Sequence, residues 1–329
     1  MILAGDIGGT WTRLAFFEAR GECLVMVVQQ EYRSGDYASL AQVVRQFEKD
    51  HGQAARHAAF GVAGPVRGGQ AKATNLPWLI DSANLARELE LEIEDVQLIN
   101  DLVANAWGVM ALGPEDLTVL NQGRADATGN AAVIAAGTGL GEAGLYWDGK
   151  RHHAFASEGG HVDFAPRDDL EIDLLRYLLA RYHRVSYERV LSGPGLHNIY
   201  CFLRDTGRGS ELPTIAEAMR SEDPAAVISQ AALKGECELC ATALDLFVTI
   251  YGAAAGNLAL KLMTSAGIYL GGGIAPRIIE KLKRPAFMEA FIDKGRMQDL
   301  LREMPVRVIM NSQAALLGAA RCAAQHADR

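Results

Sequence analysis

The segment that decides the fold reads Val96-Gln-Leu-Ile-Asn-Asp-Leu-Val-Ala104. Apolar and polar residues partly alternate from Leu91 to Ile99, which predicts a short strand, and an apolar helical pattern then runs to Met110. Asn100 and Asp101 therefore stand between a strand and a helix. Either residue makes a good helix N-cap, and for this segment alone that is the simpler interpretation. The alternative is a carboxylate held where parallel sheets place their ligands, beyond the carboxyl ends of the strands.

Composition and charge limit the functional classes. The chain has 329 residues, which predicts about two domains of ~150 residues each. A formal net charge of -8 without a dense basic run disfavours nucleic-acid binding. Asn257 and Lys261 interrupt the longest apolar region, so we expect no membrane span, and the N-terminus lacks the basic start of a signal peptide. The five cysteines are an odd, sparse set, which indicates reduced thiols and a cytoplasmic protein.

Two glycine turns repeat one arrangement. Asp6-Ile-Gly-Gly-Thr10 follows an expected strand at residues 2–7 and precedes another, and Gly137-Thr-Gly-Leu-Gly141 likewise joins two expected strands. A dinucleotide-binding fingerprint needs its glycines at the start of a helix, so that interpretation is excluded. A glycine hairpin with a threonine lets N–H groups and a hydroxyl approach phosphate oxygens, although one such turn alone is more often an ordinary hairpin. Because the arrangement occurs twice, the two turns could hold a polyphosphate from either side.

Charged residues gather around glycines in Ser157-Glu-Gly-Gly-His-Val-Asp-Phe-Ala-Pro166. This mixture indicates a site. A zinc centre is the second interpretation, but the spacing of the possible ligands matches no standard helical zinc motif. Glu188 precedes Gly193-Pro-Gly195, which we expect to end a short helix. In that helix Glu188 could serve only as a first-turn acid stabilised by the helix dipole.

Three further segments complete the pattern. Leu270-Gly-Gly-Gly-Ile-Ala-Pro276 joins an expected strand to a helix and leaves room for a flat ring to lie on the backbone. Cys237-Glu-Leu-Cys240 resembles half of a zinc site, but nothing completes it, so we assign it a structural role on a long helix at about 238–263. Residues 144–150 match most of a P-loop, yet Arg151 stands where Ser or Thr should bind magnesium, and no helix follows. We interpret that match as chance.

Six motifs, in this order, resemble the bacterial glucokinase family, which belongs to the superfamily of hexokinases, actin and heat-shock chaperones. They are Asp6-Ile-Gly-Gly-Thr10, Asn100-Asp101, Gly137-Thr-Gly-Leu-Gly141, Glu158-Gly-Gly-His161, Glu188 and Leu270-Gly-Gly-Gly-Ile-Ala-Pro276. Each motif is weakly specific alone, but their order is specific, and the resemblance runs from about Ile2 to the last expected helix. It implies an α/β, two-domain actin-like (ribonuclease H-like) ATPase fold with an interdomain cleft. We expect a small domain of residues 1–111 plus 310–329 and a large domain of residues 112–309.

The resemblance also implies the reaction and the role of each motif. Members of this family transfer the γ-phosphoryl group of MgATP to the 6-hydroxyl of glucose, giving glucose 6-phosphate and ADP, which makes Asp101 the implied general base. The positions implied to bind the sugar are Asn75, Asn100, Glu158, His161 and Glu188. Those implied to bind the nucleotide are Gly8, Gly9, Thr10, Gly137, Thr138, Gly139, Gly271, Gly272 and Gly273, with Asp6 holding Mg2+ directly or through water. Glucose and ATP are the expected partners, and a homodimer is the expected assembly.

The chemistry of these residue types agrees with that reaction. Phosphoryl transfer depends chiefly on positioning and charge neutralisation, which phosphate loops, a metal ion and one base can supply. Sugar hydroxyls both donate and accept hydrogen bonds, so carboxylates, an amide and an imidazole can satisfy them. Holding the 6-hydroxyl in line with the γ-phosphate supplies much of the rate, and a general base adds roughly 10²–10⁴-fold.

The sequence departs from the family pattern in two places, and it leaves three alternative functions open. Trp11 stands where the family has a small Asn, which could alter nucleotide packing. The cysteine-rich zinc motif of the related repressor and kinase (ROK) family does not follow His161, which indicates the zinc-free branch. The alternatives are a kinase for another hexose (mannose, fructose or an amino sugar), a sugar-sensing regulator on the same fold, and an ATPase of the actin or chaperone kind. A regulator needs a DNA-binding segment, which we do not expect before the first strand, and such an ATPase would not need the 158–161 cluster.

Overall fold

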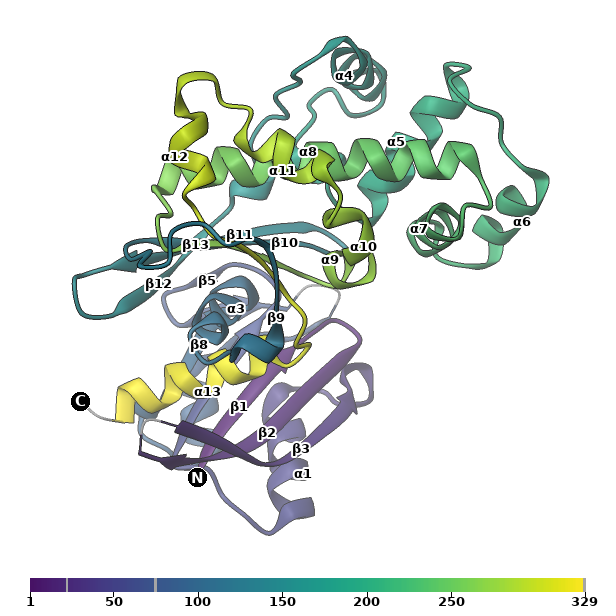
Figure 1. The fold of residues 1–329 in the computed structure, drawn as a ribbon. Coiled ribbons are helices and arrows are strands. Elements are labelled where there is room, and N and C mark those ends of the chain that lie inside the picture. Colours follow the sequence, from purple (N-terminus) through teal and green to yellow (C-terminus); the bar gives the residue numbers. More distant parts are fainter. Residues whose placement is uncertain (22, 74–75, 328–329) are drawn as a thin grey trace. The chain divides into compact units, whose positions relative to one another are not determined.

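The computed structural model describes residues 1–21, 23–73 and 76–327 and divides into two compact units (Figure 1). The first unit contains residues 1–116, 153–156 and 311–329, and the second contains residues 117–152 and 157–310. Each unit combines a central sheet with helices. The chain therefore has the mixed α/β architecture that the sequence predicted.

The sheet of the first unit has the strand order β3-β2-β1-β4-β8. β1 pairs with β2, and β2 with β3, in antiparallel register, whereas β1, β4 and β8 are parallel. The strands are β1 (Ile2–Ile7), β2 (Trp11–Arg20), β3 (Cys23–Arg33), β4 (His57–Val62) and β8 (Val96–Asn100), and a small second sheet contains β5 (Val66–Arg67), β6 (Gln70–Lys72) and β7 (Leu79–Asp81). The helices are α1 (Leu40–His51), α2 (Ser82–Glu88), α3 (Asp101–Val109) and α13 (Ala314–Ala327). Parallel strands end at one edge, so Ile7, Val62 and Asn100 share that edge.

Alternation along β1 explains why this strand is buried on both faces. Leu3 and Ile7 join the hydrophobic core on the α1 side, whereas Ile2 and Ala4 join the core formed with α3 and α13. Asp6 has the same parity as Ile2 and Ala4, so it lies on the α3 side, at the carboxyl end of the strand. The strand therefore delivers one carboxylate to the edge where α3 begins.

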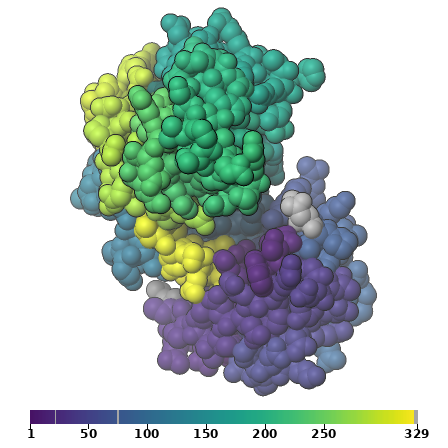
Figure 2. Space-filling view, turned by 90° about the vertical axis from the view of Figure 1, so that its right-hand side faces the viewer, coloured from purple at the N-terminus to yellow at the C-terminus, as the bar shows by residue number. Residues whose placement is uncertain are grey.

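Small residues let α13 pack directly on α3. A Cβ atom on Gly108 would overlap the carbonyl of Ala314, and one on Gly318 would overlap the carbonyl of Ala104. The helices cross at backbone contact, and in the space-filling view the yellow α13 lies against the purple residues of the same unit (Figure 2). A Cβ atom on Gly61 of β4 would stand only 2.9 Å from the Cβ of Ala104. α3 is therefore held between β4 and α13, and the position of its first residue follows from that packing.

The sheet of the second unit has the order β12-β11-β10-β13-β14-β9. Its strands are β9 (Leu117–Asn121), β10 (Ala131–Ala136), β11 (Leu140–Trp147), β12 (His152–Ser157), β13 (Gly267–Gly271) and β14 (Val306–Ile309). Its helices are α4 (Asp169–Tyr182), α5 (Gly193–Asp205), α6 (Pro213–Ser221), α7 (Pro224–Lys234), α8 (Glu238–Leu262), α9 (Ile274–Arg277), α10 (Ile279–Leu282), α11 (Pro285–Ile292) and α12 (Gln298–Arg302). β10 pairs antiparallel with β11 and parallel with β13, so the second glycine turn is also a hairpin, as predicted.

The core of the second unit forms around α8. Among the described residues this is the one helix long and apolar enough to cross a membrane, but 78% of its most apolar window is buried inside the protein, as in the core helix of a globular protein. Gly252 and Gly256 let α11 approach, because a Cβ atom on either would overlap a carbonyl of α11. Cys237 caps α8, its Sγ accepting the N–H of Cys240 at 3.4 Å, and both cysteines are buried. The pair thus takes part in the N-terminal cap and the buried face of α8, and the described part of the chain holds no cluster of three or more possible metal ligands.

Two local predictions were wrong. Gly193-Pro-Gly195 begins α5 instead of ending a helix: Ser192 caps it, accepting the N–H of Gly195 at 3.0 Å, and the proline occupies the first turn. The strand before Asp101 starts at Val96, because residues 93–95 form a 3₁₀ turn. The P-loop match at residues 144–150 lies in β11 and the turn after it, which confirms that it is a chance match.

Candidate active site

Asn100 caps helix α3, whereas Asp101 begins the helix and keeps its carboxylate available to a ligand. The Oδ1 atom of Asn100 accepts the N–H groups of Leu102 at 2.9 Å and Val103 at 3.4 Å, so Asn100 is the N-cap of α3. Its amide nitrogen donates to the carbonyl of Gly64 at 3.0 Å. Asp101 is the first helical residue, and its Oδ1 accepts the N–H of Leu102, at 3.0 Å. The cap interpretation therefore holds for Asn100, and the carboxylate of Asp101 keeps most of its acceptor capacity.

Asp101 has the protonation behaviour of a general base. Burial raises its pKa to about 6, and the negative charge of Asp6 adds to the rise, while hydrogen bonds from the N–H of Leu102 and from Asn100 oppose it. A base is most effective when its pKa lies near the working pH. Asp101 is therefore largely ionised at neutral pH and yet basic enough to take a proton from an alcohol as it reacts.

Asp6 lies near Asp101 at the same edge of the first sheet. It pairs in register with Gly61 of β4, and a Cβ atom at Gly61 would stand 3.7 Å from the Cα of Asp101. Burial also raises the pKa of Asp6, and the guanidinium of Arg13, 3.8 Å away, opposes that rise. Arg13 is held more tightly by Glu31, at 2.7 Å. A carboxylate this weakly compensated suits a divalent cation, because hard oxygen ligands are what Mg2+ prefers.

The first hairpin, residues 8–10, presents a defined set of free donors. The N–H of Gly8 donates to the carbonyl of Trp11 at 3.0 Å and is therefore closed within the turn. Across the described part of the chain, the N–H groups of Gly9 and Thr10 have no acceptor, so these two amides can bind an anion. The Trp11 side chain is 49% exposed, and only its backbone takes part in the turn.

The second hairpin, residues 137–139, has the same pattern. Gly137 donates to the carbonyl of Gly139 at 2.9 Å, and its own carbonyl accepts the N–H of Gly193 at 2.8 Å. For Thr138 and Gly139 the described residues supply no acceptor to the amide N–H. Both hairpins therefore close the first amide and leave the next two available.

A pocket of about 500 Å³ opens beside the second hairpin. Its walls come from that hairpin, from the first turns of α5 and α7, and from α9; the lining residues are Gly137, Thr138, Gly193, Pro194, Leu196, Asp223, Ala225, Ala226, Ser229, Gly273, Ile274, Arg277 and Ile278. Of the glycines at residues 271–273, only Gly273 lines it. Gly271 packs on Val133 and Ala135 within the sheet, and Gly272, at φ +79°, lies against the backbone of Ala136. The size and mostly apolar walls suit a flat heterocycle.

Glu188 joins the second hairpin to His161. Its Oε2 accepts the N–H of Leu140 at 3.0 Å, and its Oε1 lies 4.0 Å from Nδ1 of His161. A Cβ atom at Gly139 would stand 2.6 Å from Oε2, so the glycine makes room for this carboxylate. Glu188 lies in a 3₁₀ turn at residues 187–189, and these contacts go beyond those of a first-turn helix acid. Glu158 and His161 are exposed, whereas Asn75 lies outside the described residues.

Hydrogen bonds between residues 161–164 and residues 184–187 fix the segment that carries His161. Phe164 donates to the carbonyl of Val185, and Tyr187 donates to the carbonyl of Val162, each at 3.0 Å. Arg184 donates to the carbonyl of His161 and pairs with Asp163 at 2.8 Å. These contacts hold His161 next to Glu188. Sequence reasoning missed Arg184, because one arginine after a helix carries no motif.

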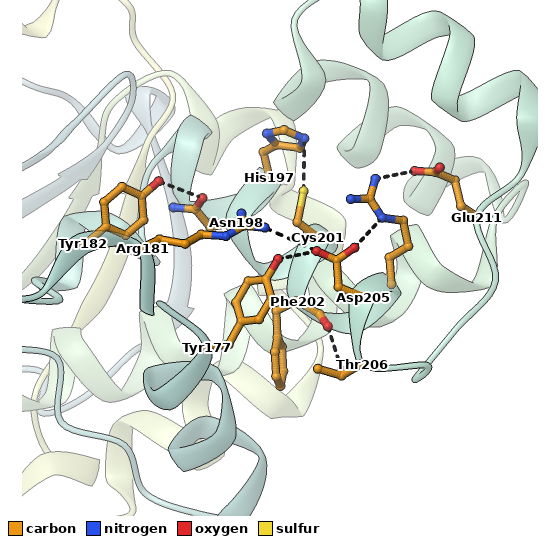
Figure 3. A network of polar contacts seen from close by, with 11 residues as sticks. Tyr177, Arg181, Tyr182, His197, Asn198, Cys201, Phe202, Asp205, Thr206 and Glu211 are labelled. Atoms are coloured by element: carbon orange, nitrogen blue, oxygen red, sulfur yellow. Dashed lines mark hydrogen bonds and ion pairs between the residues drawn. The ribbon is translucent and has the colours of Figure 1, made fainter. Parts of the chain in front are cut away.

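A second network ties α5 to α4 (Figure 3). The carboxylate of Asp205 accepts from Tyr177 at 2.5 Å, from Arg204 at 2.8 Å and from Arg181 at 3.3 Å. This network anchors the helix whose first turn lines the pocket. Nearby, Nε2 of His197 lies 3.4 Å from Sγ of Cys201. Burial raises the pKa of that thiol and lowers the pKa of that imidazole, so both groups are neutral and do not form a nucleophile and base pair.

The expected site residues thus fall into two groups. The first unit brings together Asp6, residues 8–10, Asn100 and Asp101, and the second brings together residues 137–139, Glu158, His161, Glu188 and Gly273. Sequence reasoning missed the first turns of α5 and α7 that line the pocket. A signal existed only for α5, where Ser192 followed by Gly-Pro is a helix start.

Known proteins resemble this chain in sequence and in fold. The family model described as Glucokinase matches residues 3–326. A glucokinase of Nostoc sp. is 43% identical over 341 aligned residues, covering 99% of each chain. The crystal structure of a glucokinase from an Antarctic psychrotroph is 32% identical, covers 98% of each chain and superposes with a TM-score of 0.85. A glucokinase from Balamuthia mandrillaris in complex with glucose shares the fold, at 24% identity and a TM-score of 0.79, over 98% of this chain and 93% of its own.

Proposed function

This chain belongs to the glucokinase family, and from that premise we propose that it transfers the γ-phosphoryl group of MgATP to the 6-hydroxyl of glucose, giving glucose 6-phosphate and ADP. The observation that carries the proposal is Asp101. It stands at the edge of a parallel sheet, beside a second carboxylate, and its pKa is raised to about 6. A carboxylate with that pKa can accept the proton of an alcohol during attack on phosphorus.

The nucleotide is held by both hairpins and by the pocket. Free amides at Gly9, Thr10, Thr138 and Gly139 donate to phosphate oxygens, and the base and ribose lie in the 500 Å³ pocket beside Gly273. Asp6 would hold Mg2+ directly or through water. The ion would supply neutralisation of charge on the phosphates. Hydroxyl groups of the sugar bind Asn75, Asn100, Glu158, His161 and Glu188.

In the proposed reaction, Asp101 removes the proton of the 6-hydroxyl while the hairpin amides stabilise charge on the phosphoryl oxygens. We include in the proposal the domains expected from the sequence, residues 1–111 plus 310–329 and residues 112–309. A cytoplasmic location and a homodimer are included as well. The odd, sparse set of five cysteines is the feature that supports a reducing compartment.

A hexose panel tests the proposal. The purified chain is assayed with ATP and glucose, mannose, fructose or glucosamine, with magnesium and with EDTA, beside Asp101→Asn. We expect magnesium-dependent turnover with glucose and a loss of roughly 10²–10⁴-fold in kcat in the variant. Sugar-independent ATP hydrolysis, or a variant as fast as the wild type, would contradict the mechanism. Preference for another hexose would keep the mechanism and change the substrate.

A further inference from the structure

Ser34 holds the first hairpin from behind. It follows β3 directly, and its side chain is 0% exposed. Its Oγ donates to the carbonyl of Gly8 at 2.9 Å, and its N–H donates to the carbonyl of Thr10 at 2.9 Å. The Oγ1 atom of Thr12, also 0% exposed, lies 3.0 Å from the same Oγ. One residue thus binds two of the three carbonyls of a turn that lies more than twenty residues earlier in the chain.

The direction of this short chain of hydrogen bonds follows from proton counting. A hydroxyl has one proton to donate. The proton of Ser34 goes to the carbonyl of Gly8, so Thr12 donates to the oxygen of Ser34. Both hydroxyls are shielded from water, and a donor that accepts from a second hydroxyl becomes a stronger donor itself.

The consequence for the hairpin comes from the planarity of the peptide bond. In a trans peptide the C=O of one residue and the N–H of the next point in opposite directions. Holding the carbonyl of Gly8 toward Ser34 therefore turns the N–H of Gly9 away from it. This N–H is one of the two free amides of the hairpin. Glycines rotate freely about their backbone bonds, so without this contact the peptide between Gly8 and Gly9 would adopt other orientations.

We propose that Ser34 is a positioning residue for phosphoryl transfer, which aims the N–H of Gly9 at the phosphates of the nucleotide. The inference rests on the proposed role of this hairpin in binding ATP. A donor oriented before the substrate arrives needs no reorganisation during the reaction, and this is why preorganised donors stabilise bound charge more than mobile ones do.

The test compares Ser34→Ala with the wild type in two measurements. Isothermal titration with the magnesium complex of the non-hydrolysable analogue AMPPNP gives the Kd of the nucleotide. Steady-state kinetics give kcat and the KM values for ATP and glucose separately. Loss of one hydrogen bond of ordinary strength should weaken AMPPNP binding about five- to tenfold and lower kcat/KM for ATP by a similar factor. The KM for glucose should stay within about twofold, since no sugar contact changes.

Two further variants separate positioning from stability. Thr12→Val removes the second hydroxyl and keeps the bond from Ser34 to Gly8, so it should weaken AMPPNP binding only about two- to threefold. Thr264→Val removes a buried hydroxyl of the second unit, which contacts Met304, and should leave the Kd unchanged. A Ser34→Ala protein with a lower Tm and an unchanged Kd would overturn the inference, because the bond would then be structural only.

Two other outcomes distinguish failure of this inference from failure of the proposed function. If the wild type neither binds AMPPNP nor phosphorylates glucose, the proposed function fails and the inference fails with it. If the wild type does both and Ser34→Ala matches it, the inference alone fails. Should Ser34→Ala not fold, as judged by circular dichroism, Thr12→Val replaces it as the deciding variant, and an unchanged Kd there overturns the inference.

Discussion

The two glycine hairpins have the same free amides but different supports. In both, the carbonyl of the first glycine is held, so the N–H of the following residue points the other way. In the first hairpin the donor is a side chain, the hydroxyl of Ser34. In the second hairpin the donor is the backbone N–H of Gly193. In addition, the carboxylate of Glu188 accepts the N–H of Leu140, where β11 begins. The first hairpin is supported by the hydroxyl and the backbone N–H of Ser34, whereas the second is connected to a residue of the proposed sugar site.

This difference predicts which substrates a mutation at each hairpin affects. A change behind the first hairpin can alter nucleotide binding and leave sugar binding intact. A change of Glu188, which supports the second hairpin, should alter nucleotide binding and sugar binding together. The reason is that Glu188 contacts Leu140 with one oxygen and faces His161 with the other. We therefore expect the second hairpin to couple the binding of the two substrates and the first hairpin not to do so.

Among the tests of this comparison between the hairpins, the largest effect is expected when Glu188, which joins the second hairpin to His161, is removed. Glu188→Ala loses a hydrogen bond to a charged acceptor, which contributes about 1.5–3 kcal/mol, so we expect roughly 10–100-fold rises in KM. Both the KM for glucose and the KM for ATP should rise, in contrast to Ser34→Ala. Initial-rate measurements over a grid of both substrates check this. A rise confined to glucose would remove the contrast between the two hairpins.

The pH profile of the reaction tests which unit carries the base. Asp101 acts when ionised, and burial raises its pKa to about 6. The ionised fraction therefore rises about tenfold between pH 5 and pH 7, and kcat/KM for glucose should rise by that factor, with its midpoint near pH 6. In Glu188→Ala the overall rate should fall while the midpoint stays in place, because the groups that shift Asp101 belong to the first unit. A profile that is flat from pH 5 to pH 7 would exclude Asp101 as the base.

The pattern along the chain accounts for much of the site. Both hairpins and the junction at Asn100 and Asp101 were predictable, because their chemistry lies in consecutive residues and in the change of hydrophobic period. Ser34 and Arg184 were not, since each acts on a segment about twenty residues away and neither residue type is unusual where it stands. Such contacts depend on tertiary packing, which a local pattern does not contain.

The wrong prediction at Gly193 has a different cause. Glycine and proline were interpreted as a helix stop, although Ser192 before them and the proline in the first turn are start signals. The pocket wall formed by α7 had no comparable signal, because Asp223 is an ordinary N-cap. The fold class was therefore accessible from the sequence, while the walls of the nucleotide pocket required the structure.

A measurement of the free energy of unfolding tests whether the buried carboxylate of Asp101 lowers the stability of the protein. The native pKa of Asp101 lies above its ordinary value of 3.8, so the native state loses stability as pH rises from about 4 to about 6. Asp101→Asn removes that loss. We expect it to stabilise the protein by about 1–2 kcal/mol at pH 7, below the full ~3 kcal/mol because water reaches part of the carboxylate. Urea unfolding at pH 7 and near pH 4 checks the sign: the gain should shrink at the lower pH, and a destabilised variant at pH 7 would contradict the raised pKa.

The smallest effect is expected at Trp11, which is the residue that departs from the family pattern beside the first hairpin. Its ring is 49% exposed, and the bond that closes the turn uses only its backbone carbonyl, which accepts the N–H of Gly8 at 3.0 Å. Any side chain at this position can supply that carbonyl. Trp11→Asn should therefore change the KM for ATP by no more than about twofold, the usual range for an exposed substitution without special contacts. A larger rise would mean that the indole touches the nucleotide, and the first hairpin would then have a side-chain support on its open face as well as behind it.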